Sequence, residues 1–192
     1  VLVCKNYHQA KAIKESAATS RQVTIVGAGY SGIELAEAYA NTDHDVTLLQ
    51  GTSQVLSNYI DPEMSARIVT LLQQHGVTVH LNTPVTAFHT TTPDAPVEIE
   101  TPKGTFTSDL VVTCTGFIPN TDLLEGQVAT DRHGAIITNK WLETSNPTIF
   151  AAGDACAAQF NPTDAPAFIP LATNAVQQGR IIAKNLFGHV QA

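Results

Sequence analysis

Short apolar runs alternate with amphipathic segments through the first part of the chain. The runs at residues 23–26, 46–50 and 77–82 have the length and composition of buried strands. Between them, residues 31–40 and 61–76 carry apolar positions at the spacing of a helix that buries one face. This strand–helix alternation predicts a doubly wound parallel sheet.

The ends of the second helix are marked in the sequence. Asp61 is suited to the N-cap position, and Pro62 follows it at the first helical position. Gly76 is typical of the residue that ends a helix. A more polar helical segment, residues 7–17, precedes the first strand.

The middle of the chain has a different pattern. Residues 84–91, 95–101 and 104–109 alternate apolar and polar side chains, and "TPKG" at 101–104 suits a hairpin turn. We predict an antiparallel β-meander, inserted before a further buried strand within residues 110–116.

Beyond residue 120 the pattern predicts a strand at 133–138, a strand and turn at 146–158, and a helix at 170–188. These few elements supply too few apolar residues for a hydrophobic core of their own. The predicted fold class is therefore α/β, a Rossmann-like doubly wound parallel sheet with an inserted β-meander, plus a partial second domain. The predicted division is a connecting segment at 1–20, the Rossmann-like domain at 21–119, and the second domain at 120–192.

Composition narrows the function classes. Of 192 residues, 43% are hydrophobic and the net charge is −7, with Lys and Arg scattered, which argues against a nucleic-acid partner. No apolar run is long enough to span a membrane. Three dispersed cysteines, Cys4, Cys114 and Cys156, and scattered histidines predict no disulfide framework and no metal site, and they favour a cytoplasmic location.

A G-x-G-x-x-G pattern, Gly27, Gly29 and Gly32, lies between the first buried strand and its helix. In that setting the first glycine permits a tight turn, the second admits a pyrophosphate, and the third allows close helix–strand packing. We interpret the loop as a dinucleotide site, against the alternative of a structural glycine turn.

The nature of the dinucleotide depends on Gln50, which ends the second strand, where an acid usually binds the adenosine ribose. Its amide can still hydrogen-bond a hydroxyl. Because "QGTSQ" contains no Arg or Lys to bind a 2′-phosphate, NADH is favoured over NADPH.

Four stretches together resemble the flavin-dependent pyridine nucleotide–disulfide oxidoreductases, in the branch of NADH oxidase, NADH peroxidase and coenzyme A–disulfide reductase. They are "IVGAGYSGIELAEA", "VTCTGFIPNTDLL", "TIFAAGDA" and "PLATNAVQQGRIIAKNL", in that order and covering essentially the whole chain.

The resemblance implies roles for residues around the glycine loop. Tyr30 would be the aromatic residue that covers the flavin until nicotinamide arrives, and Glu34 would lie near the nicotinamide. Tyr59 would pack beside the adenine. Alternatively, the tyrosines are loop aromatics that cover apolar surface, and Glu34 is a solvated helix residue. The resemblance also places Ser31, Thr115 and Gly116 along NADH.

A second set of residues would contact FAD. In "TIFAAGDA", Gly153 and Asp154 would lie at the ribityl or phosphate part, with an N-cap aspartate as the alternative. The backbone of Leu171, Ala172 and Thr173 would lie at the isoalloxazine.

The resemblance further implies a homodimeric parent in which NADH passes hydride to FAD, and electrons then reach oxygen, peroxide or a disulfide. The FAD glycine loop and the redox cysteine of this branch would lie upstream of Val1, so we expect no catalytic residue in this chain. The three cysteines are interpreted as packing residues. Two alternatives stay open: a ferredoxin or rubredoxin reductase, and a non-catalytic NADH-binding module.

Overall fold

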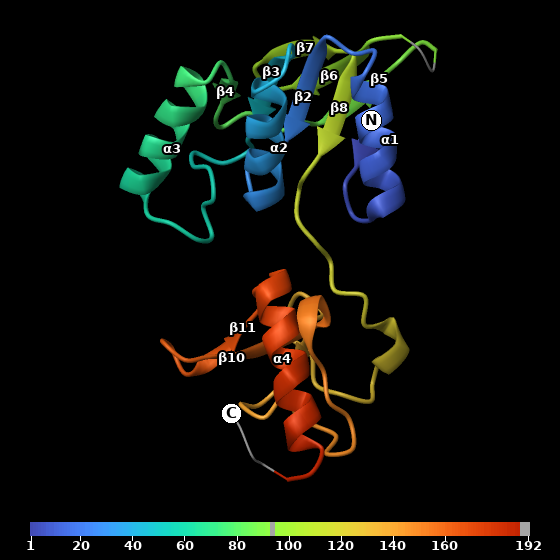
Figure 1. Cartoon of the computed structure of the whole chain (residues 1–192), viewed down its shortest axis with the longest axis vertical. Helices are drawn as coiled ribbons and strands as arrows, with labels where there is room; N and C mark the ends of the chain where they lie inside the picture. The colour runs from blue at the N-terminus through green and yellow to red at the C-terminus, as the bar shows by residue number, and fades with distance from the viewer. Residues whose placement is uncertain (93–94, 189–192) are drawn as a thin grey trace. The chain divides into compact units, whose positions relative to one another are not determined.

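The computed structural model describes residues 1–92 and 95–188, and the chain divides into two compact units, Val1–Gly116 and Phe117–Ala192 (Figure 1). The first unit is built on a five-stranded sheet in the order β1-β8-β2-β3-β4, in which every neighbouring pair is parallel. Its strands are β1 (Leu2–Val3), β2 (Gln22–Val26), β3 (Asp45–Leu49), β4 (Thr78–His80) and β8 (Leu110–Thr113).

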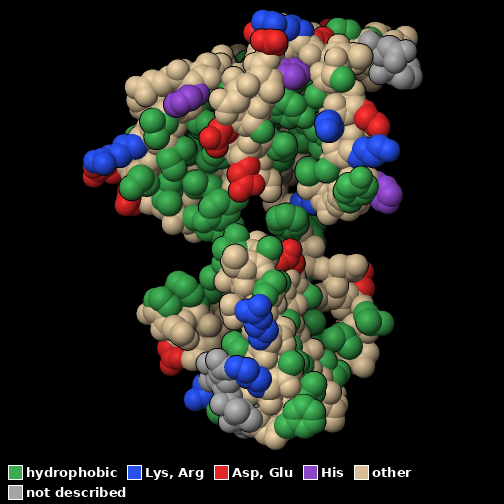
Figure 2. Space-filling view, in the orientation of Figure 1, with side chains coloured by type: hydrophobic (Ala, Val, Ile, Leu, Met, Phe, Trp, Pro, Cys, Tyr) green, Lys and Arg blue, Asp and Glu red, His purple; other side chains and the backbone are tan. Residues whose placement is uncertain are grey.

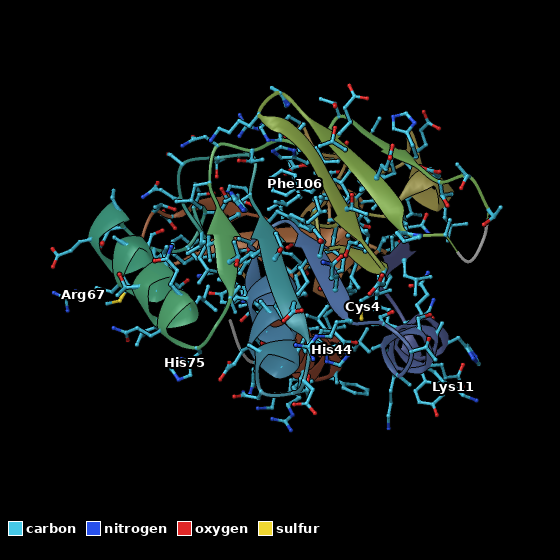
Figure 3. All side chains as sticks on the ribbon, turned by 90° about the horizontal axis from the view of Figure 1, so that it is seen from above. Cys4, Lys11, His44, Arg67, His75 and Phe106 are labelled. Atoms are coloured by element: carbon cyan, nitrogen blue, oxygen red, sulfur yellow. The ribbon has the colours of Figure 1, made fainter. Side chains whose placement is uncertain are left out.

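Two layers cover this sheet, one on each face (Figure 3). The helices α1 (Tyr7–Ala17), α2 (Tyr30–Ala40) and α3 (Pro62–Gln74) lie on one face. The other face carries an antiparallel meander of β5 (Ala87–His89), β6 (Val97–Thr101) and β7 (Gly104–Ser108).

Each face has its own apolar core, because side chains alternate along a strand. On the helix side, Ile25 and Leu48 are fully buried and pack with Ala36 and Leu72. On the meander side, the buried residues are Val26, Leu49, Val97, Ile99 and Val111. Burial on both faces explains why the strands appear in the sequence as short, continuous apolar runs.

The structure confirms the strand–helix alternation and the inserted meander predicted for this unit. The Asp61 side chain accepts a hydrogen bond from the Met64 backbone N–H at 2.8 Å, and Pro62 opens α3. Gly76, just beyond the helix, adopts a φ of 86°, which favours glycine.

The second unit contains a small sheet in the order β11-β10-β9 and one long helix. Its elements are β9 (Ile136–Ile137), β10 (Cys156–Phe160), β11 (Ala165–Ala167), α4 (Ala172–Asn185) and the 3-10 turns η1 (Asp122–Leu124) and η2 (Gly153–Ala155).

The sequence prediction differs from the structure at residues 146–158. Phe150 forms an isolated bridge with Glu143, and the strand of this region is β10, which follows the η2 turn. The hairpin between β10 and β11 was not predicted, because alanine dominates these strands and alanine has little strand preference.

Residues 1–20 contribute to the first unit. They form β1, which pairs with β8, and α1, whose Ile13 and Ala17 are buried in the helix-side core. The compact unit therefore begins at Val1 and ends at Gly116, compared with the predicted limits of 21–119.

The described residues contain no helix with the length and apolar character needed to cross a membrane. Figure 2 shows Lys and Arg side chains dispersed among Asp and Glu on the face in view, as the sequence predicts.

Candidate functional site

The candidate site lies at the carboxyl edge of the parallel sheet. From β2 the chain crosses through α2 to β3 and through α3 to β4, whereas β8 and β1 lie on the other side of β2. The direction of the connections thus changes between β2 and β8. In open α/β sheets this change creates a crevice, outside the carboxyl ends of the strands, that suits a ligand.

The glycine loop lies at this edge, and two of its glycines are required by close backbone contacts. Gly27 has a φ of 99°, and a Cβ atom there would lie 2.5 Å from the carbonyl oxygen of Cys114. A Cβ atom on Gly32 would lie 1.9 Å from the carbonyl oxygen of Gly27. Neither position can hold a side chain without moving the backbone.

Gly29 is different because its surroundings are open. A Cβ atom there would meet nothing within 4 Å. Gly29 is also the N-cap of α2 and offers no side-chain acceptor to the first helical turn, which includes the half-buried Ser31. The first N–H groups of a helix lack partners within it and favour an anion. An open approach to these groups fits a pyrophosphate.

Gln50 connects the end of β3 to the glycine loop. Its Oε1 accepts a hydrogen bond from the Ala28 backbone N–H at 2.8 Å. Its Nε2 donates to Thr52 Oγ1 at 2.7 Å and to the Gln54 carbonyl oxygen at 3.1 Å. The Ala28 carbonyl oxygen in turn accepts from the Leu56 backbone N–H at 2.8 Å. The loop after β3 therefore fixes the glycine loop from the side.

These bonds fix the orientation of the Gln50 side-chain amide. Because a backbone N–H can only donate, the amide oxygen must face Ala28. Both amide hydrogens are used, whereas the oxygen keeps a second lone pair. The position therefore offers an additional ligand an acceptor without a full negative charge.

The two tyrosines singled out from the sequence lie together. The Tyr30 and Tyr59 rings have centroids 4.4 Å apart with a tilt of 42°, and each side chain is 40% exposed. Burial, and to a lesser degree the neighbouring Tyr30, raises the pKa of Tyr59 above its ordinary value. Tyr30 opens α2 directly after Gly29, so the pair lies next to the glycine loop.

The remaining residues expected around NADH are exposed. Glu34 lies one turn into α2, and Thr115 and Gly116 follow β8. Gly116 has a φ of 98°, and its carbonyl oxygen accepts a hydrogen bond from Lys5 Nζ. Sequence reasoning missed Lys5, because the pairing of β1 with β8 that brings it here is not evident from a local pattern.

The residues expected around FAD lie in the second unit, where η2 contacts α4. Gly153, with a φ of 71°, donates its backbone N–H to Gln178 Oε1 at 2.6 Å. Asp154 is exposed and is followed by β10, so it does not cap a helix. Leu171 is the N-cap of α4 and supplies no capping side chain, and Ala172 and Thr173 form the first turn. The turn thus offers uncapped N–H groups to a ligand.

The thiols of two cysteines, Cys114 and Cys156, are less acidic than an ordinary cysteine thiol. Burial is the main cause that raises the pKa of Cys114 from 9.0 to about 11, with a smaller contribution from Cys4. Burial, and then Asp154, raise the pKa of Cys156 from 9.0 to about 11. Since the thiolate is the nucleophile, neither thiol is activated at neutral pH.

Known proteins share this architecture over nearly the whole chain. An NADH oxidase of Enterococcus faecalis is 41% identical over 186 residues, which is 97% of this chain and 42% of the relative. The structure of a water-forming NADH oxidase from Lactobacillus brevis bound to NADH is 44% identical with a TM-score of 0.90, covering 99% of this chain and 41% of that one. A putidaredoxin reductase in covalent complex with putidaredoxin is 28% identical with a TM-score of 0.89, covering 99% and 46%.

This chain therefore spans about two-fifths of the length of the NADH oxidases that it matches. The model of one protein family, described as pyridine nucleotide-disulphide oxidoreductase, matches residues 2–179. The chain belongs to the pyridine nucleotide-disulphide oxidoreductase family.

Proposed function

We propose that this chain is the NADH-binding part, together with part of the FAD-binding domain, of an FAD-dependent NADH oxidoreductase. The observation that carries the proposal is the open backbone at Gly29, at the uncapped N-terminus of α2 and the carboxyl edge of the sheet. In this proposal the first unit is the NADH domain, and the second unit belongs to the FAD domain.

Different residues of the first unit would contact different parts of the dinucleotide. The N–H groups that follow Gly29 would bind the pyrophosphate. The tilted Tyr30–Tyr59 pair, with each tyrosine 40% exposed, would form an apolar wall beside the dinucleotide. Toward the nicotinamide we assign Glu34 on α2. Ser31, through its backbone, and Thr115 and Gly116 would lie along NADH.

NADH is the dinucleotide that Gln50 favours. A 2′-hydroxyl can donate to the second lone pair of the amide oxygen, whereas a 2′-phosphate offers acceptor oxygens. Both amide hydrogens are already bonded to Thr52 and Gln54, so the side chain has no donor to give a phosphate.

For FAD, the exposed carboxylate of Asp154 would accept hydrogen bonds from hydroxyl groups, and Gly153 would allow a close approach. The first turn of α4, from Leu171 to Thr173, would present its N–H groups. When bound, the two cofactors supply the hydride chemistry, and this chain supplies binding and orientation.

For the whole protein we propose oxygen, peroxide or a disulfide as the final acceptor, a cytoplasmic location, and a homodimer. A reductase of an iron protein is the second reading, but the identity of 28% to the putidaredoxin reductase is well below the 41% and 44% to the NADH oxidases. A non-catalytic NADH-binding module would leave the Asp154 turn and the start of α4 without a purpose.

Calorimetric titration of NADH and NADPH into this chain tests the proposal. We expect NADH to release heat of binding and NADPH to bind more weakly. Gly29→Val should abolish NADH binding because its side chain fills the approach to the helix N-terminus. Gly179→Val is the matched control, since a Cβ atom there also meets nothing within 4 Å but lies in α4. Equal binding by the wild type and Gly29→Val would refute the site.

A further inference from the structure

Two of the three cysteines directly follow neighbouring strands of the first unit: Cys4 comes after β1, and Cys114 comes after β8. β1 and β8 are parallel, with Leu2 opposite Val112 and Val3 opposite Thr113. The paired residues end there, and the same register continued by one residue beyond the strand ends would place Cys4 opposite Cys114. Neighbouring strands are about 4.7–4.9 Å apart, within the range of about 4.4–6.8 Å between Cα atoms that a disulfide spans.

Both cysteines also face the same side of the sheet. Leu2 and Cys4 are two residues apart, as are Val112 and Cys114, and all four contact the core between the sheet and the helices. Figure 3 shows Cys4 beside α1, on the helix-covered face. Their side chains therefore project in parallel from adjacent strands into one layer.

Charge effects agree with this proximity. After burial, the largest influence on the Cys114 thiol is Cys4, which raises its pKa, while Lys5 lowers it. Cys156 has other neighbours: its Sγ lies 3.7 Å from Gln178 Oε1, within the second unit.

We propose that Cys4 and Cys114 form an oxidation-sensitive dithiol site beneath the glycine loop, which hydrogen peroxide converts into an intramolecular disulfide. Cys4 loses its proton, and its thiolate attacks one oxygen of the peroxide and becomes a sulfenic acid as the O–O bond breaks. The hydroxide that leaves takes up the proton and becomes water. The Cys114 thiol then attacks the sulfenic sulfur, forms the S–S bond and releases the sulfenic oxygen as water. The two thiols lose two electrons and two protons, and one peroxide is reduced to two waters.

The position of Cys114 connects this site to the glycine loop. Its backbone N–H donates to the Val26 carbonyl oxygen at 2.7 Å, and its carbonyl oxygen is the atom that excludes a side chain at Gly27. Its Cβ atom lies 3.5 Å from where a Cβ atom on Gly32 would stand. If closing the disulfide shifts the Cys114 backbone, these contacts pass that shift to the glycine loop. We therefore expect the disulfide to lower the affinity of the glycine loop for NADH. This expectation rests on the proposed function, whereas the formation of the disulfide does not.

Non-reducing proteolysis with mass spectrometry of the peroxide-treated chain tests the site. We expect a peptide that joins Cys4 to Cys114, and a fall in free thiols from three to one that dithiothreitol reverses. Cys156→Ser should keep the joined peptide, and Cys4→Ser and Cys114→Ser should each abolish it. Oxidation without this peptide, or pairing that requires Cys156, would overturn the proposal.

NADH titrations of the same oxidised and reduced samples test the effect on the glycine loop separately from the formation of the disulfide. We expect the affinity of the oxidised chain for NADH to be lower by a factor of about five or more, and reduction of the disulfide to restore it. A disulfide that leaves the affinity unchanged would overturn the coupling to the loop. Failure of the reduced chain to bind NADH would refute the proposed function instead, while the joined peptide would still decide the dithiol site.

Discussion

Gln50→Ala tests whether the glycine loop is held by the side chain that ends β3. The variant removes the acceptor of the Ala28 backbone N–H, and Ala28 is only 1% exposed. A buried donor left without a partner costs about 1–3 kcal/mol. Thr52 is exposed, so water can replace the bond that its hydroxyl loses. We therefore expect the free energy of unfolding of the first unit to fall by about 2 kcal/mol.

The distribution of aromatic residues allows the unfolding of each unit to be followed separately. All four tyrosines, Tyr7, Tyr30, Tyr39 and Tyr59, lie in the first unit, and the single tryptophan, Trp141, lies in the second. In urea titrations, tyrosine emission should therefore report the first unit, and tryptophan emission the second. We expect Gln50→Ala to move the tyrosine transition to lower urea and to leave the tryptophan transition in place.

Thr52→Ala is the matched control for this experiment. It removes one of the two acceptors of Gln50 Nε2 and the hydroxyl that donates to the Gln54 carbonyl oxygen at 3.0 Å, but it leaves the Ala28 bond intact. Because Thr52 is exposed and water can replace its bonds, we expect a loss below about 0.5 kcal/mol. A loss below about 0.5 kcal/mol in Gln50→Ala itself would refute the reasoning, since the Ala28 N–H would then have another partner.

Gly32→Ala should destabilise the first unit by about 1–3 kcal/mol or more in urea titrations, because its Cβ atom meets backbone atoms. Gly29→Ala should cost less, below about 1 kcal/mol, because its Cβ atom meets nothing within 4 Å and only the N-cap preference for glycine over alanine is lost. A double-mutant cycle with Tyr30→Ala and Tyr59→Ala should give a coupling energy of about 0.5–1.5 kcal/mol; additive losses would contradict the ring contact. Since burial raises the pKa of Cys114 from 9.0 to about 11, the folded chain keeps a proton that the unfolded chain loses, so stability should fall from pH 9 to 11, less steeply in Cys114→Ala. Equal slopes would contradict the burial of this thiol.

Much of the first unit could be predicted from local patterns. Strands buried on both faces form apolar runs such as residues 23–26, and the α3 boundaries follow from Asp61, Pro62 and Gly76. The role of Gly27 and Gly32 in close packing was likewise predictable, because the spacing and the strand–helix setting require it.

Features that depend on the pairing of distant segments could not be predicted. The pairing of β1 with β8 brings Lys5 to Gly116 and places Cys4 and Cys114 just beyond the paired residues, although more than a hundred residues separate the members of each pair. The sequence prediction assigned Gln50 to a ribose hydroxyl but gave no sign that the side chain also holds Ala28, since that bond depends on how the glycine loop lies against β3.

The most direct test of the central claim is a titration of the isotope-labelled chain with NADH, followed by amide NMR. We expect the largest shifts at Ala28 to Gly32, with further shifts at Thr115 and Gly116, because these backbone groups lie at the carboxyl edge of β2 and β8. The amides of the meander strand β6, on the far layer, should stay unchanged and serve as the internal reference. Saturable shifts that spare the glycine loop and gather elsewhere in the chain would contradict the account.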